Sequence, residues 1–217
     1  MIPAKNEGEN LGEVVRGARE HAREVLVVDG RSTDDTALVA TGAGARVVTD
    51  SGRGKGLAIR ESTAFVTTGI TVLMDADGSH DPKDIPRLVE PIRRGVADHV
   101  TGSRLLGGSS ELHGGFDEWA RLSGSSFITA CINWRYGVRL SDSQNGFRAV
   151  KTDVLRRLPL RSRGFTIEQE MIVETLRHGY RMAEVPAHEH ARKSGKSHVS
   201  VWRDGYKYVL SLARLLL

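Results

Sequence analysis

The sequence has little cysteine and no long apolar run, and each shortage excludes a class of protein. The single cysteine, Cys131, cannot form an intramolecular disulfide, which fits a reducing compartment. No run approaches the roughly 20 apolar residues that a membrane-spanning helix needs. Lys5, Glu7 and Glu9 interrupt any apolar segment of a secretory signal peptide. We therefore expect a cytoplasmic location.

A large excess of one charge sign is also missing. Lys and Arg number 31 against 27 Asp and Glu, so the formal net charge is only +4. This small excess is compatible with anionic ligands or with an anionic membrane surface. No basic tract or recognised nucleic-acid-binding motif accompanies it, so we expect no nucleic-acid partner.

The first 75 residues alternate short apolar segments with amphipathic, helix-like segments. This alternation predicts an α/β fold, with a mostly parallel central sheet and helices on both faces. With 217 residues and no linker, we expect a single domain covering residues 1–217. The first strand has only about three residues, so it is either incomplete or a short edge strand. The predicted strands of this region are residues 1–4, 25–28, 45–48 and 70–74.

Two aspartates directly follow the fourth predicted strand. Asp75 and Asp77 stand one residue apart, and Gly78 follows them. Ligands of open α/β sheets bind beyond the carboxyl ends of the strands. Two carboxylates at such a place suit Mg²⁺ or Mn²⁺ held jointly with substrate phosphates. Ordinary turn chemistry is the alternative, since Asp and Gly are common in turns, and this motif taken alone favours the turn interpretation.

Local signals predict two further features. Ser32 or Thr33 is expected to cap the helix that follows the second strand. Farther along, several apolar side chains of residues 119–134 fall near one helical face, Phe127 and Trp134 among them. Packing in the core is the expected role of that face.

The last predicted helix, residues 199–217, is amphipathic. Trp202 and Leu210 lie on its apolar side, and Arg203 accompanies that face. Such a helix can lie at a membrane interface with its basic residues near anionic headgroups. It can also pack on the core of the domain. We favour membrane contact because this end of the sequence is rich in Leu.

Seven short motifs occur in order along almost the whole chain. Their sequences include Gly54-Lys55-Gly56, Asp75-Ala76-Asp77-Gly78 and Gln144-Asn145-Gly146-Phe147-Arg148. Any one motif is a weak signal, but together they resemble family 2 glycosyltransferases of the GT-A nucleotide-diphospho-sugar transferase fold. The closest likeness is to the dolichyl-phosphate or polyprenyl-phosphate hexosyltransferase branch, which includes dolichol-phosphate mannosyltransferases. The motifs lie at residues 2–7, 27–34, 54–56, 74–82, 102–104, 144–148 and 192–197.

The resemblance implies where a nucleotide sugar, a GDP- or UDP-hexose, would bind. Residues at the first strand end would line the nucleotide pocket, and Asp29 would accept a hydrogen bond from a base N–H. Asp75 and Asp77 would hold Mg²⁺ or Mn²⁺, which neutralises the donor diphosphate as the glycosidic bond breaks. The implied donor-binding residues are Pro3, Ala4, Asn6, Glu7, Asp29, Lys55, Asp75, Ala76 and Asp77.

The resemblance also implies an acceptor, a polyprenyl or dolichyl phosphate, and inverting transfer of mannose or glucose at the cytoplasmic face of a membrane. A phosphate is already a nucleophilic oxyanion, so it needs cationic positioning more than a general base. Guanidinium groups can bind phosphate oxygens bidentately, although any such cation can also be a solvated surface charge. The implied acceptor-binding residues are Arg104, Arg121, Gln144, Arg192, Lys193 and Lys196, and the implied catalytic residues are Asp77, Arg104 and Arg121.

The chain departs from the family pattern in places. Paired acids usually follow the second strand, whereas here Asp29 precedes Gly30 and Arg31. Ser79 occupies a position where relatives often place another metal ligand, so we do not expect it to bind the metal directly. His80, a lone loop histidine, is more often a bystander than a ligand.

Other functions are compatible with the sequence. A family 2 enzyme acting on a sugar hydroxyl or a small soluble acceptor would need a general base. Asp117, Glu118 and Asp142 are the candidates for that base. A non-catalytic nucleotide-sugar-binding module fits less well, because Asp75 and Asp77 are both present.

Overall fold

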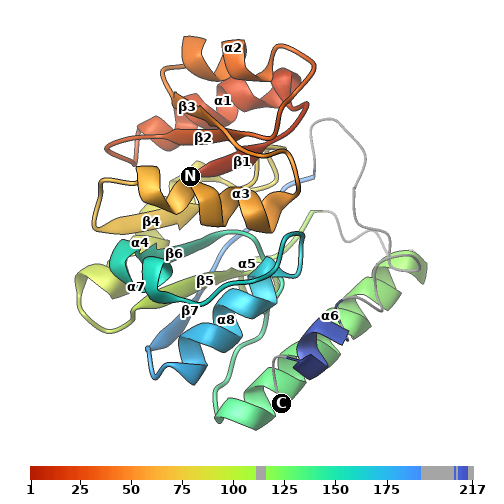
Figure 1. Cartoon of the computed structure of the whole chain (residues 1–217). Coiled ribbons are helices and arrows are strands. Elements are labelled where there is room, and N and C mark those ends of the chain that lie inside the picture. The colour runs from red at the N-terminus through yellow and green to blue at the C-terminus, as the bar shows by residue number, and fades with distance from the viewer. Residues whose placement is uncertain (111–115, 192–207, 209, 215–217) are drawn as a thin grey trace.

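A computed structural model describes residues 1–110, 116–191, 208 and 210–214, and the side chains of 116–121 lie outside its description. Strands and helices alternate along the chain, as the apolar pattern predicts (Figure 1). The elements in chain order are β1 (Ile2–Ala4), α1 (Gly8–Arg19), β2 (Leu26–Asp29), α2 (Thr36–Gly42), β3 (Arg46–Thr49), α3 (Lys55–Ser62), η1 (Thr63–Phe65), β4 (Ile70–Leu73), η2 (Pro82–Asp84), α4 (Ile85–Arg93), β5 (His99–Ser103), α5 (Arg104–Gly107), α6 (Phe116–Tyr136), β6 (Arg148–Lys151), α7 (Thr152–Arg157), α8 (Ile167–Arg177) and β7 (Met182–Pro186).

The strands form two hydrogen-bonded sets that meet at β1 and β4. The first set has the order β1-β2-β3 and the second the order β4-β6-β5-β7. The Met74 N–H donates to the Met1 carbonyl at 3.2 Å, and the Met1 amino group donates to the Val72 carbonyl at 2.8 Å. The residue that precedes β1 therefore bonds to the β4 segment, and β1 stands at the end of its own hydrogen-bonded set, next to β4. Parallel pairing predominates as predicted, and β6 is the exception because it runs antiparallel to β4 and β5.

The register brings several chain segments to one edge of the sheet. Ala4 pairs with Asp29, and Asp29 pairs with Thr49, so the first three strands end together. In the second set Leu73 pairs with Arg148, which means that antiparallel β6 begins where β4 ends. Strand β7 ends beside the end of β5. The segments that precede β6 and follow β7 consequently reach the same edge as the strand ends.

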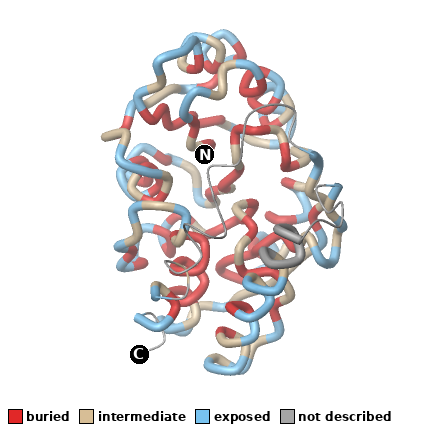
Figure 2. Tube along the Cα trace, turned by 90° about the vertical axis from the view of Figure 1, so that its right-hand side faces the viewer, coloured by how far each residue is buried: buried red, intermediate tan, exposed pale blue. Residues whose placement is uncertain are grey.

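Alternating side chains place helices on both faces, as predicted. Val27 packs with Leu11 of α1 and Leu88 of α4 on one face of the sheet. Its neighbour Val28 packs with Ala58 of α3 on the other face. Helices α7 and α8 cover that second face over the β4–β6 half. The buried positions gather along these layers in the interior, and exposed positions lie on the outer turns (Figure 2).

Helix α6 lies outside α8 and buries a different stripe from the one predicted. Ile128 and Ile132 pack against residues of α8, whereas Phe127 and Trp134 are 59% and 86% exposed. The core-packing prediction is therefore wrong for the two aromatic residues. The apolar run around them offers several overlapping faces, and burial selects the aliphatic one that fits against α8.

The described part of the C-terminal segment packs on α6 and α8. Leu212 is buried in the cluster that Ile128 and Ile132 form with α8, and the Gln169 Nε2 donates to the Tyr208 carbonyl at 3.1 Å. The core alternative thus holds for Leu212, while the remainder of predicted helix 199–217 lies mostly outside the described residues. Within the part of the chain that the structure describes, no helix combines the length and apolar character needed to cross a bilayer.

Candidate active site

Hydrogen bonds between two loops shape the ends of β1 and β2. Asn6 has a positive φ of 55°, which Asn tolerates better than most residues, and its N–H donates to the Ser32 Oγ at 2.9 Å. The Thr33 N–H donates to the Asn6 Oδ1 at 2.8 Å. Helix α2 begins only at Thr36, whose N–H donates to the Asp34 carboxylate at 3.0 Å. The prediction that Ser32 or Thr33 caps this helix is wrong, because both residues tie the two loops together instead.

Two buried carboxylates lie at the ends of β2 and β3. Asp29 accepts a hydrogen bond from the Ser32 N–H at 3.3 Å, and Asp50 accepts one from the Gly52 N–H at 2.6 Å. Burial raises the pKa of Asp50, and the nearby Asp29 carboxylate adds to that effect. Asp50 was not among the predicted site residues. Its signal was present in the sequence, since it follows a strand directly, as Asp75 does.

The other residues predicted at the β1 end belong to the same loop pair. Ala4 is buried, and its carbonyl accepts a hydrogen bond from the Gly30 N–H at 2.8 Å. The Glu7 N–H donates to the Thr36 Oγ1 at 2.9 Å. Pro3 pairs with Val28 in the sheet and faces the same small cavity as Asp75. The structure therefore places the predicted nucleotide end beside the predicted metal end.

The two aspartates after β4 differ in their surroundings. The Asp75 side chain is 31% exposed, whereas Asp77 is buried. The Asp77 Oδ1 accepts hydrogen bonds from the Ser79 N–H at 3.1 Å and from the Ser79 Oγ at 2.7 Å. Gly78 between them has a φ of 77°, in the left-handed region that glycine adopts without strain. Ser79 thus orients the carboxylate of Asp77 in the turn.

His80 supports this turn through contacts of its ring. Its ring stacks on Phe147 with a centroid distance of 4.8 Å and an interplanar angle of 11°. Its Nδ1 accepts a hydrogen bond from the Asp75 N–H at 3.1 Å. Burial lowers the pKa of His80, which favours the neutral ring that such an acceptor requires. His80 therefore helps to hold the strand end through its contacts with Asp75 and Phe147.

Lys55 connects the strand end to helix α8. Its Nζ lies 2.5 Å from the Asp75 Oδ1 and 2.7 Å from the Glu168 Oε1. Burial alone would lower the pKa of Lys55, but Asp75 and Glu168 raise it above its ordinary value. Sequence reasoning missed Glu168, which lies near the start of a distant helix and is brought here by the position of α8 beside β6.

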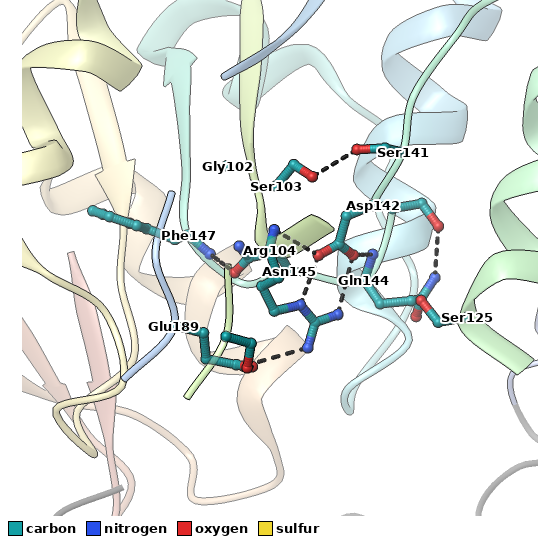
Figure 3. A network of polar contacts seen from close by, with 12 residues as sticks. Gly102, Ser103, Arg104, Ser125, Ser141, Asp142, Gln144, Asn145, Phe147 and Glu189 are labelled. Atoms are coloured by element: carbon teal, nitrogen blue, oxygen red, sulfur yellow. Dashed lines mark hydrogen bonds and ion pairs between the residues drawn. The ribbon is translucent and has the colours of Figure 1, made fainter. Parts of the chain in front are cut away.

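Arg104 is held by carboxylates on two sides (Figure 3). Its Nε and Nη2 donate to the two oxygens of Asp142 at 2.6 and 3.0 Å, and its Nη1 donates to the Glu189 Oε1 at 3.3 Å. Burial alone would lower the pKa of Arg104, but these two carboxylates raise it above its ordinary value. The guanidinium predicted to bind an acceptor phosphate therefore already has a bidentate carboxylate partner.

The loop before β6 is fixed by one further carboxylate. Glu184 of β7 accepts hydrogen bonds from the Ser141 and Asp142 N–H groups, each at 2.9 Å. The Gln144 N–H donates to the Asp142 carboxylate at 3.0 Å, which places predicted Gln144 beside predicted Arg104. The other acceptor-binding predictions fall on residues whose side chains lie outside the described part of the chain: Arg121, Arg192, Lys193 and Lys196.

The residues at the end of β4 fit a divalent cation that is shared with a ligand. The Asp75 side chain is 31% exposed, so other oxygen ligands can reach it, and it packs closely on Gly146, where a Cβ atom would lie 2.8 Å from the Asp75 Oδ2. No group of three or more His, Cys, Asp or Glu residues arranged to hold a metal occurs among the described residues. Two aspartates with room for other oxygen ligands is the usual arrangement for Mg²⁺ held jointly with phosphates and water.

The sheet order, its helical layers and the carboxylates at the strand ends define a class of protein. The chain is a nucleotide-sugar-dependent glycosyltransferase of the GT-A fold. Its residues 1–158 match the model of glycosyl transferase family 2, and the chain belongs to that family. This result confirms the resemblance found in the sequence motifs.

Individual relatives agree with this assignment. The chain is 32% identical over 217 residues to glycosyltransferase AglJ of Haloferax volcanii, covering 99% of this chain and 70% of that protein. It is 34% identical over 219 residues to an undecaprenyl-phosphate mannosyltransferase of Micrococcus luteus, covering 92% and 86% respectively. Its fold is similar to that of glucosyl-3-phosphoglycerate synthase from Mycobacterium tuberculosis in complex with Mn²⁺, UDP and glucosyl-3-phosphoglycerate. That likeness has a TM-score of 0.80 and 22% identity over 99% of this chain and 78% of the other.

Proposed function

We propose that this protein transfers a hexose, mannose or glucose, from a GDP- or UDP-sugar to a polyprenyl phosphate with inversion at the anomeric carbon. The observation that carries the proposal is the adjacency of the Asp75–Asp77 turn to the ends of β1 and β2. One edge of the sheet then offers carboxylates for a metal and neighbouring loops for a nucleotide. The undecaprenyl-phosphate mannosyltransferase among the relatives supports the lipid phosphate as acceptor.

The reaction forms one bond and breaks one. An oxygen of the acceptor phosphate attacks the anomeric carbon, and the bond between that carbon and the nucleoside diphosphate breaks. Asp75 and Asp77 would hold Mg²⁺ or Mn²⁺, and the metal would neutralise the charge on the leaving diphosphate. Pro3, Ala4 and Asp29 would bind the nucleoside, so that the diphosphate extends toward Lys55.

The surroundings of Asp142 favour an acceptor that needs no general base. Burial alone would raise the pKa of Asp142, but its pairing with Arg104 lowers that pKa below its ordinary value. A carboxylate held in a bidentate ion pair is a poor base for a sugar hydroxyl. A phosphate oxyanion avoids this requirement. Arg104 would orient the phosphate through whichever N–H it can release from Glu189, since that contact is the longer one.

The alternative acceptor is a small soluble phosphate compound. The structural relative bound to glucosyl-3-phosphoglycerate supports this second candidate. Both candidates share the donor site and differ only in the acceptor. Transfer assays with a short polyprenyl phosphate and with 3-phosphoglycerate therefore separate them.

We also propose that the protein acts at the cytoplasmic face of a membrane. Phe127 and Trp134 support this proposal, because they are exposed and lie seven residues apart on one side of α6. Sedimentation with anionic lipid vesicles tests it. Trp134→Ser is expected to reduce the bound fraction, and equal sedimentation of the variant would contradict a role for this face.

Donor titration by calorimetry is the first test of the proposed function. GDP- and UDP-sugars are titrated into the protein with and without Mn²⁺, alongside Asp75→Ala and Asp77→Ala variants. We expect one nucleotide sugar to bind in a metal-dependent manner and both variants to lose that binding. Absence of binding by every nucleotide sugar in the presence of Mn²⁺ would overturn the proposal.

A further inference from the structure

The Lys55 ammonium occupies the space beside an expected metal ligand. Its Nζ lies 2.5 Å from the Asp75 Oδ1, and both groups pack closely against Gly146. A Cβ atom at Gly146 would lie 3.0 Å from the Nζ and 2.8 Å from the Asp75 Oδ2, so little room remains around this ion pair. A metal ion held by Asp75 would therefore compete with the lysine for this carboxylate.

Glu168 gives the ammonium a second partner that does not depend on Asp75. Glu168 is buried, its Oε1 lies 2.7 Å from the Lys55 Nζ, and its Oε2 has no hydrogen-bond partner among the described residues. The buried Arg148 donates to the Glu168 carbonyl at 2.9 Å and supplies further positive charge nearby. Glu168 can therefore retain the lysine after Asp75 has turned to another cation.

The four charged residues that line this cavity balance one another without a metal, since Lys55 and Arg148 offset Asp75 and Glu168. Asp77 adds one negative charge at the expected metal site, so a divalent cation alone would leave an excess of positive charge beside Lys55. A cation that arrives with an anionic diphosphate adds little net charge, and the diphosphate oxygens can accept the hydrogen bonds that Lys55 withdraws from Asp75.

We propose that Lys55 is a positioning residue that occupies Asp75 until metal and donor diphosphate bind together, and that Glu168 holds it throughout. The proposal rests on the proposed function, since it needs a metal at Asp75. It makes metal binding and nucleotide binding mutually dependent. The metal alone must displace Lys55, whereas the metal with a nucleotide gives Lys55 a new partner.

Binding of Mn²⁺ to the full chain, measured by electron paramagnetic resonance with and without UDP or GDP, tests this proposal. Lys55→Met removes the competing cation, so we expect Mn²⁺ alone to bind about tenfold more tightly than in the wild type. The enhancement of Mn²⁺ binding by nucleotide should be largely lost in this variant. Lys151→Met is the matched control, because it breaks a 2.8 Å pair with Asp98 at the opposite edge and should change neither quantity.

Glu168→Gln provides the second variant. It leaves Lys55 with Asp75 as its remaining carboxylate, so Mn²⁺ alone should bind more weakly than in the wild type. A merely structural role for the ion-pair network would weaken Mn²⁺ binding in both variants, and this result would overturn the inference. Unchanged Mn²⁺ binding in Lys55→Met would overturn it as well. Failure of the wild type to bind Mn²⁺ with any nucleotide would instead overturn the proposed function, and this inference with it.

Discussion

The two halves of the ligand-binding edge are held together by different forces. At the ends of β1 and β2, amide and hydroxyl groups of Asn6, Ser32 and Thr33 join the loops. At the ends of β4 and β5, ion pairs centred on Lys55 and Arg104 join the loops and helices. Among the described residues of the first half, no Lys or Arg forms an ion pair with the carboxylate of Asp29 or Asp50, and the Arg31 Nε donates to the Asp50 carbonyl at 3.3 Å.

This difference fits what each half would bind under the proposed function. Carboxylates that have no cationic partner suit the neutral N–H groups of a nucleobase, because they can accept a hydrogen bond from such a group without displacing a cation. Cations paired in advance suit a phosphate, which can replace a carboxylate as their partner. Each phosphate contact in the second half would have to replace a carboxylate that already pairs with the cation. Phosphate binding there would therefore depend on the exchange of one anionic partner for another.

The largest effect is expected from Asp77→Asn in the second half. The amide keeps the size of the side chain but loses the charge that would hold the metal, so transfer should fall by about 10²–10³-fold. Transfer rates at saturating donor and Mn²⁺ measure this loss. The fold should survive, because an amide oxygen can still accept the hydrogen bonds of Ser79. A variant with nearly normal transfer would remove Asp77 from the site.

Breaking the Arg104–Asp142 pair should have the next largest effect. Arg104→Met leaves the buried Asp142 carboxylate without its bidentate partner, which should cost about 3 kcal/mol of unfolding free energy. Chemical denaturation measures the loss, and the double variant Arg104→Met with Asp142→Asn should recover part of it. Unchanged stability with lost transfer would show instead that Arg104 serves the acceptor and contributes little to the fold.

The first half was easier to predict from the sequence than the second. Its strands are consecutive neighbours, so the apolar alternation and the turn residues place Asn6 and Asp29 together. In the second half, β6 enters the sheet between β4 and β5 in the antiparallel direction. No local pattern encodes that direction, and it is what brings Gly146 and α8 to the edge.

The missed residues follow from the same physical cause. Glu168 and Glu189 are carboxylates in a helix and a loop, and only the tertiary arrangement shows that they pair with Lys55 and Arg104. The motifs correctly indicated that Arg104 lies near the strand ends. They could not indicate that its guanidinium is already bound by Asp142, a residue 38 positions away.

Asp98 forms ion pairs at the edge of the second strand set that lies away from the candidate site. The contribution of these ion pairs to stability can be tested by changing the pH. Burial alone would raise the pKa of Asp98, but hydrogen bonds from Arg181 and Lys151 lower it well below its ordinary value of 3.8. A lowered folded-state pKa stabilises the fold above pH 3.8, and this contribution is lost as the pH falls through the folded-state value. Asp98→Asn should therefore reduce stability by about 1–2 kcal/mol at pH 7 and by a smaller amount near pH 2, where this contribution is partly lost. Denaturation curves at both pH values measure the difference, and an equal loss at both would contradict the assignment.

The smallest effect is expected in the first half, from Ser32→Ala. The variant removes one exposed hydroxyl that accepts the Asn6 N–H, so unfolding free energy should fall by only about 0.5–1 kcal/mol. Because Asn6 lies at the predicted nucleotide pocket, the KM for the donor should rise while kcat stays unchanged, as expected when ground-state and transition-state binding weaken equally. Thr41→Ala is the matched control, since its exposed hydroxyl donates to the Ala37 carbonyl within α2, away from the loop pair. A fall in kcat for Ser32→Ala would mean that this loop pair also positions the reacting groups. The two halves would then differ in the kind of contact that holds them and would share a role in catalysis.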